Sequence, residues 1–353
     1  MNPPDRLAGR PLAASAGILL DELFGEPGFG THPVALFGRA MRRIEGSLYA
    51  DDRRRGVVHA FTGTAIGAAA GVVLRSDTVA SYVAIAGRSL RDAAAVVAAP
   101  LGSGDLAIAR GQLPSLVGRD PTGLDAKEIT RAVVESLAEN TVDAVVAPAL
   151  WAAFAGASGA LAYRAVNTMD AMVGYRSARY ERYGWASARL DDVANWIPAR
   201  VTALLVAAVR PRSAVAVWTA VRTQASSHPS PNSGVAEAAF AAALGIRLGG
   251  TNVYGGQTEI RPALGSGPSP DIDDIARASS LSRDVGRALA LSLLTISLCG
   301  RGAVSIAKGG AVSKAKGGAA SEEKGGAVSL TKGGAVSMAL RGVISLGRRS
   351  VRS

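Results

Sequence analysis

The chain has 353 residues, of which 48% are hydrophobic and only 5% aromatic, and its formal net charge is +11. This length can bury one or two domain-sized cores in water or several helices in a lipid bilayer, and the many small residues favour close helix packing in lipid. A nucleic-acid-binding protein is disfavoured: the basic excess, concentrated in residues 39–55 and after Arg301, lacks interleaved aromatic residues, and no base-reading motif is present.

Cys299 is the only cysteine, so the chain can form no intramolecular disulfide and no cysteine-based metal site. Its apolar surroundings predict a buried structural thiol. The N-terminus does not resemble a standard signal peptide, because Asp21 and Glu22 interrupt the apolar residues 12–20 before any small-residue cleavage site. We therefore expect this stretch to be retained.

Apolar segments in chain order predict an all-α, polytopic integral membrane protein with polar, partly helical active-site loops. Residues 56–74 and 142–163 approach the roughly 20 residues that a bilayer requires. The shorter segments are expected to be tilted, half-spanning or packed against protein: residues 12–20, 201–209 with an extension toward Trp218, 236–246 and 285–299.

Residues 79–99 are apolar overall but contain Arg88, Arg91 and Asp92. Each charge would cost roughly 2.5–3.5 kcal/mol at the centre of a bilayer. An interfacial amphipathic helix is therefore the favoured prediction, and the number of complete crossings stays open.

A repeat occupies the end of the chain. From Ala303 the motif AVS or a close variant recurs every eight residues, accompanied by lysines with the same period. Such Gly-rich low complexity buries little surface. We expect a membrane-embedded domain over residues 1–300 and, over 301–353, a flexible tail without a catalytic role. A solenoid is the less favoured alternative.

Four polar runs separate the apolar segments and are the candidates for chemistry. The first, LDELFGEPGFGTHPVALFGR at residues 20–39, has the glycines and prolines of a turn-rich loop that presents Asp21, Glu22, Glu26 and His32. Irregular backbone beside a membrane usually lines a cavity. A capped helix connection is an equally good interpretation.

The second run covers residues 117–143. On a helix, Asp125, Glu128, Glu135 and Glu139 fall within one arc of roughly 80°. A solvated helix face is the ordinary explanation of such a stripe. A function is favoured by the junction with the apolar segment at Val142, because it places the acids at the membrane surface, where a hydrated divalent cation could bridge them to phosphate.

The third run, residues 163–200, predicts an anion site with an acidic, metal-holding corner. Arginine matches phosphate and carboxylate geometry bidentately. A positive-inside loop would explain the arginines but not the neighbouring Asp191, Asp192 and Asn195. The run contains six arginines: Arg164, Arg176, Arg179, Arg182, Arg189 and Arg200.

The fourth run begins at His228 and ends near residue 256. Its small polar residues lead into a predicted helix that carries Glu237, and a helix N-terminus offers N–H groups and a dipole to an anion. His228 is a candidate general base or phosphate donor. An ordinary N-cap is the alternative.

Taken together and in this order, the four runs resemble the adenosylcobinamide-phosphate synthase family, membrane proteins of cobalamin biosynthesis. The resemblance covers most of residues 18–300. It is carried by LDELFGEP and HPV, GRD with VESLAENTVD, VNTMDAMVGYRSARYERYGWASARLDDVANWIPAR, and HPSPNSGVAEAAFAAALG with LGGTNVYGG. Glu26 stands where the family often has Asp, and the repeat tail is not a recognised family feature.

The resemblance implies an acid–amine ligase that uses ATP as cosubstrate and Mg²⁺. It would join the propionate carboxyl of adenosylcobyric acid to an amino alcohol phosphate, typically aminopropanol phosphate, so the cobalt corrinoid is a substrate and not a prosthetic group. The implied location is the cell membrane, multi-pass, with the active site facing the cytoplasm. The lipid bilayer and other late corrinoid-pathway membrane enzymes are the further candidate partners, and no nucleic acid is expected.

Combining the residue inventory with the resemblance, we assign three sets of site residues. The predicted catalytic residues are Glu135, Glu139, Asp192 and His228. The predicted metal ligands are Glu128 and Asp191. The predicted substrate-binding residues are Arg119, Arg131, Asn140, Arg164, Asn167, Arg176, Arg179, Arg189, Asn195, Ser230, Asn232, Ser233 and Gly234. The nucleotide site is not located, because the sequence has no G-x-x-x-x-G-K-[ST] loop.

Two other functions compete with this prediction. A membrane alcohol phosphotransferase would need a D-G-x-x-A-R core, and Asp191-Asp192-Val193 lacks its glycine. A transporter or scaffold subunit of the corrinoid pathway is the non-enzyme alternative. It predicts substrate flux or partner binding without turnover.

Overall fold

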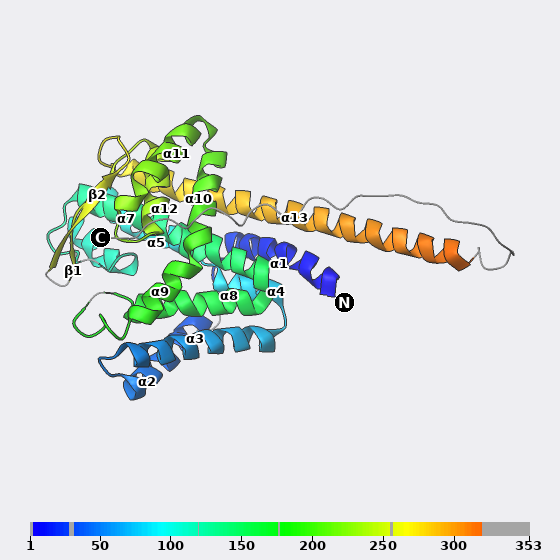
Figure 1. Ribbon diagram of the computed structural model, residues 1–353. Coiled ribbons are helices and arrows are strands. Elements are labelled where there is room, and N and C mark those ends of the chain that lie inside the picture. Colours follow the sequence, from blue (N-terminus) through cyan, green and yellow to red (C-terminus); the bar gives the residue numbers. More distant parts are fainter. Residues whose placement is uncertain (1–2, 28–31, 119, 176, 255–256, 320–353) are drawn as a thin grey trace, which may run out of the picture. The chain divides into compact units, whose positions relative to one another are not determined.

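The structure is a computed structural model that describes residues 3–27, 32–118, 120–175, 177–254 and 257–319 (Figure 1). Residues 1–304 form one compact unit. The predicted helical class is confirmed, and in the described part of the chain one β-hairpin is added to it. The principal helices are α1 (Pro3–Phe24), α2 (Pro33–Leu48), α3 (Arg53–Leu74), α4 (Asp77–Ala84), α5 (Gly87–Gly102), α6 (Leu106–Gln112), α7 (Ala126–Thr141), α8 (Ala147–Val173), α9 (Trp185–Ala194), α10 (Trp196–Val209), α11 (Ala214–Thr223), α12 (Ser233–Leu244) and α13 (Asp273–Ala319).

The chain reverses direction inside α8. Gly156 has φ +66° and ψ −150°, a conformation that is essentially restricted to glycine. The side chain of Asn167 donates to Asp143 Oδ2 at 3.2 Å, although a separation of 24 positions would span roughly 36 Å of straight helix. α8 is therefore a helical hairpin, with an outgoing arm before Gly156 and a return arm after it. The outgoing arm continues from α7 through a π-helical turn, Val142–Val146.

Two charged side chains hold the tip of this hairpin. Arg10 Nη1, from α1, donates to the backbone oxygen of Phe154 at 2.9 Å. Asp77 Oδ1, at the start of α4, accepts from the backbone N–H of Ala157 at 2.7 Å. Both contacts satisfy backbone groups that the break leaves without an intrahelical partner.

Helix α3 packs along the return arm and runs antiparallel to it. Gly63 of α3 faces Met169, whereas Gly71 faces Ala157 beside the tip. A Cβ atom at Gly71 would approach the backbone of Ala157 to 2.5 Å. Glycine thus allows the two backbones to come together, as in many membrane helix pairs.

In the part of the chain that the structure describes, two helical stretches are long and apolar enough to cross a membrane, Arg53–Leu74 and Ala126–Val173. The count rises to three if α9 and α10, which meet at a bend of 42°, form one crossing. Residues 56–74 were predicted as a span, and α3 has the length, the composition and the exposed Phe61, Val72 and Val73 to face lipid. The span predicted at residues 142–163 is wrong as a straight helix, because the hairpin turns at Gly156 within it.

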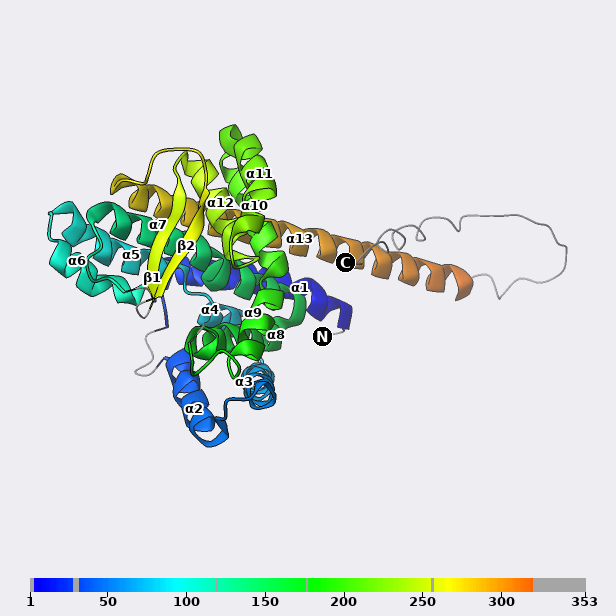
Figure 2. The same cartoon turned by 60° about the vertical axis from the view of Figure 1, so that its left-hand side comes forward.

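Two further expectations are corrected, and one element was not expected. Residues 79–99 do not form one amphipathic helix: α4 ends at Ala84, α5 begins at Gly87, and Arg91 pairs with Glu22 at 2.5 Å. Cys299 is exposed rather than buried. The hairpin of β1 (Leu248–Tyr254) and β2 (Gln257–Leu264) was not predicted. Figure 2 shows it beside α7 and α12, the helices that it contacts.

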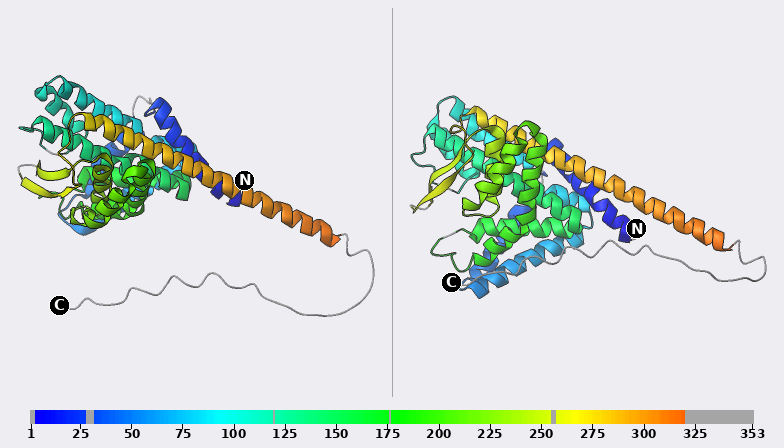
Figure 3. Two further views of the ribbon diagram at one scale, coloured as in Figure 1. Left: turned by 90° about the horizontal axis from the view of Figure 1, so that it is seen from above. Right: turned by 45° about the horizontal axis from the view of Figure 1, so that its top comes forward.

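Helix α13 closes the compact unit by packing on α1 (Figure 3). Ser15 Oγ donates to the backbone oxygen of Ala290 at 2.9 Å, and Ser297 Oγ donates to that of Ala8 at 2.7 Å. α13 extends to Ala319 and so includes the first two repeat units. The flexibility of the tail stays a prediction.

Candidate functional site

A pocket of about 180 Å³ lies where α7, the return arm of α8, α9 and the loop before α12 meet. Among the described residues that line it there is no lysine or arginine. Like charges at such short range repel, so the pocket favours cations and protons. Its polar lining consists of five carboxylates and four neutral residues: Glu139, Asp143, Asp170, Asp191 and Asp192, with Asn195, Ser230, Asn232 and Ser233.

The hairpin in α8 creates the acidic wall of this pocket. Glu139 and Asp143 lie one turn apart before the reversal, and Asp170 lies near the end of the return arm. Asn167 Nδ2 bridges the hairpin to α9, with Asp143 Oδ2 at 3.2 Å and Asp191 Oδ1 at 3.5 Å. Carboxylates from both arms and from α9 therefore face one cavity.

Asp191 is held in place by a second asparagine. Asn195 Nδ2 donates to Asp191 Oδ2 at 2.9 Å, while Asn195 Oδ1 accepts from the buried hydroxyl of Tyr163 at 2.8 Å. Tyr163 in turn belongs to the return arm. Two amide groups thus orient the Asp191 carboxylate without adding positive charge.

The loop before α12 supplies the neutral side of the pocket. Ser233 Oγ donates to Glu139 Oε1 at 2.6 Å, and Asn232 Nδ2 donates to the backbone oxygen of Asp192 at 2.8 Å. Ser230 Oγ accepts from the backbone N–H of Ser233 at 3.1 Å. One of the N–H groups predicted to bind an anion at this helix start is therefore already used by the protein.

The arginines that were predicted to bind substrate do not lie together in one site. Arg189 pairs with Asp192 of the pocket lining at 3.3 Å, whereas Arg164 Nη1 lies 3.5 Å from Oδ1 of Asn167, which is outside that lining. Arg179 instead binds Glu45 at 3.1 Å and stacks over the ring of Tyr49, away from the pocket lining. Arg119 and Arg176 lie outside the described residues.

The acidic stripe on α7 does not act as one site. Asp125 and Glu128 form a capping box: Asp125 Oδ1 accepts from the N–H of Glu128 at 2.8 Å, and Glu128 Oε2 accepts from that of Asp125 at 2.9 Å. Glu135 lies under the β-hairpin, where its Oε1 accepts from Gly249 N at 2.9 Å. Only Glu139 reaches the pocket, because the pocket touches only the last turn of α7.

The geometry corrects the assignment of Glu128 as a metal ligand, since its carboxylate caps α7 and does not line the pocket. Within the described ranges no group of three or more His, Cys, Asp or Glu side chains could hold a metal ion by itself. Two predicted substrate-binding residues on α7 also lie outside the pocket lining. Arg131 donates to the backbone oxygen of Thr251 at 2.8 Å, and Asn140 Nδ2 donates to that of Ser136 at 2.9 Å.

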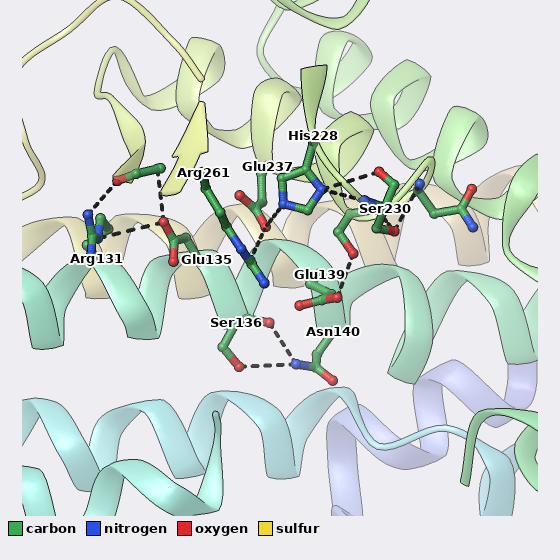
Figure 4. A network of polar contacts seen from close by, with 12 residues as sticks. Arg131, Glu135, Ser136, Glu139, Asn140, His228, Ser230, Glu237 and Arg261 are labelled. Atoms are coloured by element: carbon green, nitrogen blue, oxygen red, sulfur yellow. Dashed lines mark hydrogen bonds and ion pairs between the residues drawn. The ribbon is translucent and has the colours of Figure 1, made fainter. Parts of the chain in front are cut away.

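His228 belongs to the loop before α12, but its side chain is not part of the pocket lining and lies toward Glu237 (Figure 4). Its Nδ1 accepts from the backbone N–H of Ser230 at 3.1 Å, and its ring faces Glu237. Burial, together with the charge of Arg261, lowers the pKa of His228 below its usual range. Gly234 has a packing role here, because a Cβ atom would come within 2.5 Å of His228 Cβ.

Three residues at the site were assigned no role from the sequence: Asp143 and Tyr163, and Asp170, which was noted only as one of the polar residues of the third run. Asp143 follows Glu139 by four residues, and Asp170 follows Asn167 by three, so each lies on a helix face with a residue that had been predicted. That spacing was the available signal. Nothing in it indicates that the two faces meet across the reversal at Gly156.

Comparison with known proteins gives the family. The CobD/Cbib protein family matches residues 14–282. The cobalamin biosynthesis protein CobD of Mycobacterium tuberculosis (strain ATCC 25618 / H37Rv) is 47% identical over 294 residues, covering 78% of this chain and 92% of that protein. The corresponding proteins of Pelobacter propionicus and Rhodobacter capsulatus are 39% identical over 309 residues (81% and 94% covered) and 42% identical over 285 (76% and 88%). No solved structure matches. The chain therefore belongs to the CobD/Cbib family.

Proposed function

We propose that this chain is an adenosylcobinamide-phosphate synthase of cobalamin biosynthesis. It joins the carboxyl group of adenosylcobyric acid to the amine of an amino alcohol phosphate, such as aminopropanol phosphate, in an amide bond. Cleavage of ATP drives the reaction, and the oxygen lost by the carboxyl group leaves on the phosphate product. Support comes from the family match and from relatives named as cobalamin biosynthesis proteins. The observation that carries the chemistry is the pocket with five carboxylates and no basic lining residue among those described.

An acidic pocket suits the amine substrate. An aliphatic amine is an ammonium ion in neutral water and must lose a proton before it can attack a carboxyl carbon. Carboxylates attract the ammonium ion and can accept that proton. We assign proton acceptance to Glu139 and Asp143, and leave Asp191, which two asparagines hold in place, for the metal ion.

The phosphate of the same substrate then belongs at the edge of the pocket. Arg189, whose side chain is 65% exposed, pairs with Asp192 at the pocket wall. Arginine is suited to phosphate through its planar fork of donors. The amino alcohol phosphate is thus oriented with its amine inside and its phosphate toward Arg189.

Mg²⁺ and ATP complete the proposal. Mg²⁺ prefers oxygen ligands and is usually bound by one or two carboxylates, with water and substrate phosphates supplying the rest. Asp191 and Asp192, both in the pocket lining, offer such a partial oxygen donor set. When bound, the ion would neutralise the negative charge of the ATP phosphates.

We propose the cell membrane as the location, with the pocket facing the cytoplasm. Gly56, near the start of α3, packs on the backbone of Tyr183, between the return arm and α9. The start of α3 therefore lies toward the pocket end of the hairpin. Basic residues flanking a span usually remain cytoplasmic. Six exposed arginines lie in α2 or in the first turn of α3: Arg39, Arg42, Arg43, Arg53, Arg54 and Arg55.

The test uses the purified protein in liposomes with adenosylcobyric acid, aminopropanol phosphate, ATP and Mg²⁺, and detects the amide by mass spectrometry. We expect turnover by the wild type and by the control Asp92→Asn, an exposed carboxylate on α5. Asp191→Asn should lower the rate by roughly 100-fold or more.

The same assay separates the alternatives. Absence of amide under conditions in which a CobD relative is active would refute the synthase proposal. Corrinoid flux into the vesicles without amide would instead support a transporter. Transfer of a phospho-alcohol group without amide would support a phosphotransferase.

A further inference from the structure

We propose that Glu237 of α12 is a positioning residue, which couples the β-hairpin to the pocket loop (residues 228–233) through Arg261 and His228. The loop in turn places Ser230 and Ser233 on the pocket wall. The kinetic part of this inference rests on the proposed function, whereas its structural part does not.

Glu237 is an unusual residue for its surroundings. It is 0% exposed, and the other buried residues of this helix after Ser233 and Gly234 are all apolar: Val235, four alanines, Phe240 and Leu244. Burying a carboxylate is costly unless charged partners compensate, and even a compensated pair is often no more stable than apolar side chains of similar size. A gain in stability is therefore a poor explanation for this residue, and control of geometry is a better one.

The partners of Glu237 come from two separate segments (Figure 4). Its Oε1 lies 3.6 Å from Nε2 of His228, on the pocket loop, and 3.7 Å from Nη1 of Arg261, on β2. Both side chains are nearly enclosed, at 2% and 17% exposure. One buried carboxylate thus lies between the pocket loop and the β-hairpin.

The ring of His228 carries this constraint into the loop. Its Nδ1 lies 3.1 Å from the backbone nitrogen of Ser230 and 3.3 Å from the backbone oxygen of the same residue. When Nδ1 accepts the N–H, a neutral ring holds its proton on Nε2, the atom that faces Glu237. The carboxylate therefore favours both the tautomer and the ring orientation in which Ser230 is held.

From Ser230 the contacts reach the pocket in two steps. Ser230 Oγ accepts the backbone N–H groups of Asn232 at 3.3 Å and Ser233 at 3.1 Å. Ser233 Oγ then donates to Glu139 Oε1 at 2.6 Å. A change at Glu237 can thus alter a pocket carboxylate that it does not touch.

The β-hairpin, which carries Arg261, is held in place by several hydrogen bonds. Arg131 of α7 donates to the backbone oxygen of Thr251, and Glu135 accepts from Gly249 N. Beyond β2, Gly265 N donates to Gln224 Oε1 at 2.7 Å. Because β1 and β2 are also paired with each other, Arg261 approaches Glu237 from a fixed position.

The experiment compares Glu237→Gln with Glu45→Gln. Glu45 is also a buried carboxylate with an arginine and a tyrosine as partners, but it lies away from the pocket lining. We measure hydrogen exchange of the amides in residues 228–233, and the KM and kcat of the amide-forming reaction. Glu237→Gln should speed exchange at Ser230 and Ser233 and raise KM for the amino alcohol phosphate, each by roughly 10-fold. Glu45→Gln should change neither.

Arg261→Gln provides a second test if Glu237→Gln does not fold, because it changes only the hairpin end of the contact. It should speed exchange at the same amides. Because the two residues act through one contact, the fold-change in exchange of the double variant should be smaller than the product of the two single fold-changes. Unchanged exchange in residues 228–233 for the variants that fold would overturn the inference. If the wild type makes no amide, the proposed function fails while the exchange measurement still decides the coupling.

Discussion

Replacing Gly156 with alanine tests the reversal that builds the pocket. At φ +66° and ψ −150° a residue with a side chain is strained by about 1–3 kcal/mol. The new Cβ atom would also lie 2.6 Å from Asp77 Oδ1 and 3.1 Å from Arg10 Nε, the side chains that hold the tip. Overpacking of this kind costs about 1–3 kcal/mol. We expect a total destabilisation of about 2–6 kcal/mol.

The sign of this effect is diagnostic. If α8 were a straight helix, the same substitution would stabilise it by about 0.5–1 kcal/mol, because alanine is the better helix former. A reversal at Gly156 and a straight helix α8 thus predict opposite shifts of the melting temperature for Gly156→Ala.

Thermal unfolding in detergent, followed by circular dichroism, measures the shift, and two glycines serve as controls. Gly46→Ala, in an open position on α2, should be neutral or slightly stabilising. Gly104→Ala changes a residue with φ +81° and nothing within 4 Å, so it reports backbone strain without a clash. If Gly156→Ala were as stable as Gly46→Ala, the reversal would be refuted.

Three further predictions concern buried polar groups. Tyr163→Phe leaves Asn195 Oδ1 without its hydroxyl donor and should cost about 1–3 kcal/mol in thermal unfolding, with reduced turnover; full retention of both would contradict the described site. Burial raises the pKa of Asp21 above 3.8, so wild-type stability should fall as the pH rises from about 4 through the raised value. Asp21→Asn should remove that slope, and equal slopes would count against a buried carboxyl. Burial lowers the pKa of His228 below 6.5, so stability should fall as the pH is lowered from about 6.5 toward the folded-state pKa, and His228→Gln should flatten that window.

The sequence by itself determined the helical class, the polar runs and much of the pocket lining. Glu139, Asp191, Asp192 and Asn195 were predicted site residues and do lie around one cavity. The loop of Ser230, Asn232 and Ser233 was predicted as well. Such predictions succeed because residues one helical turn apart share a face whatever the rest of the fold does.

Only the tertiary structure decided which faces meet. An apolar run with a glycine looks the same whether it crosses a membrane or turns back, so the contact between Asp143 and Asn167 had no signal in the sequence. Likewise, His228 has the chemistry of a general base, but the packing of Gly234 and the contact with Glu237 keep its ring out of the pocket lining. Helical periodicity relates residues within a few turns, whereas the pocket depends on distances between segments that are far apart in the chain.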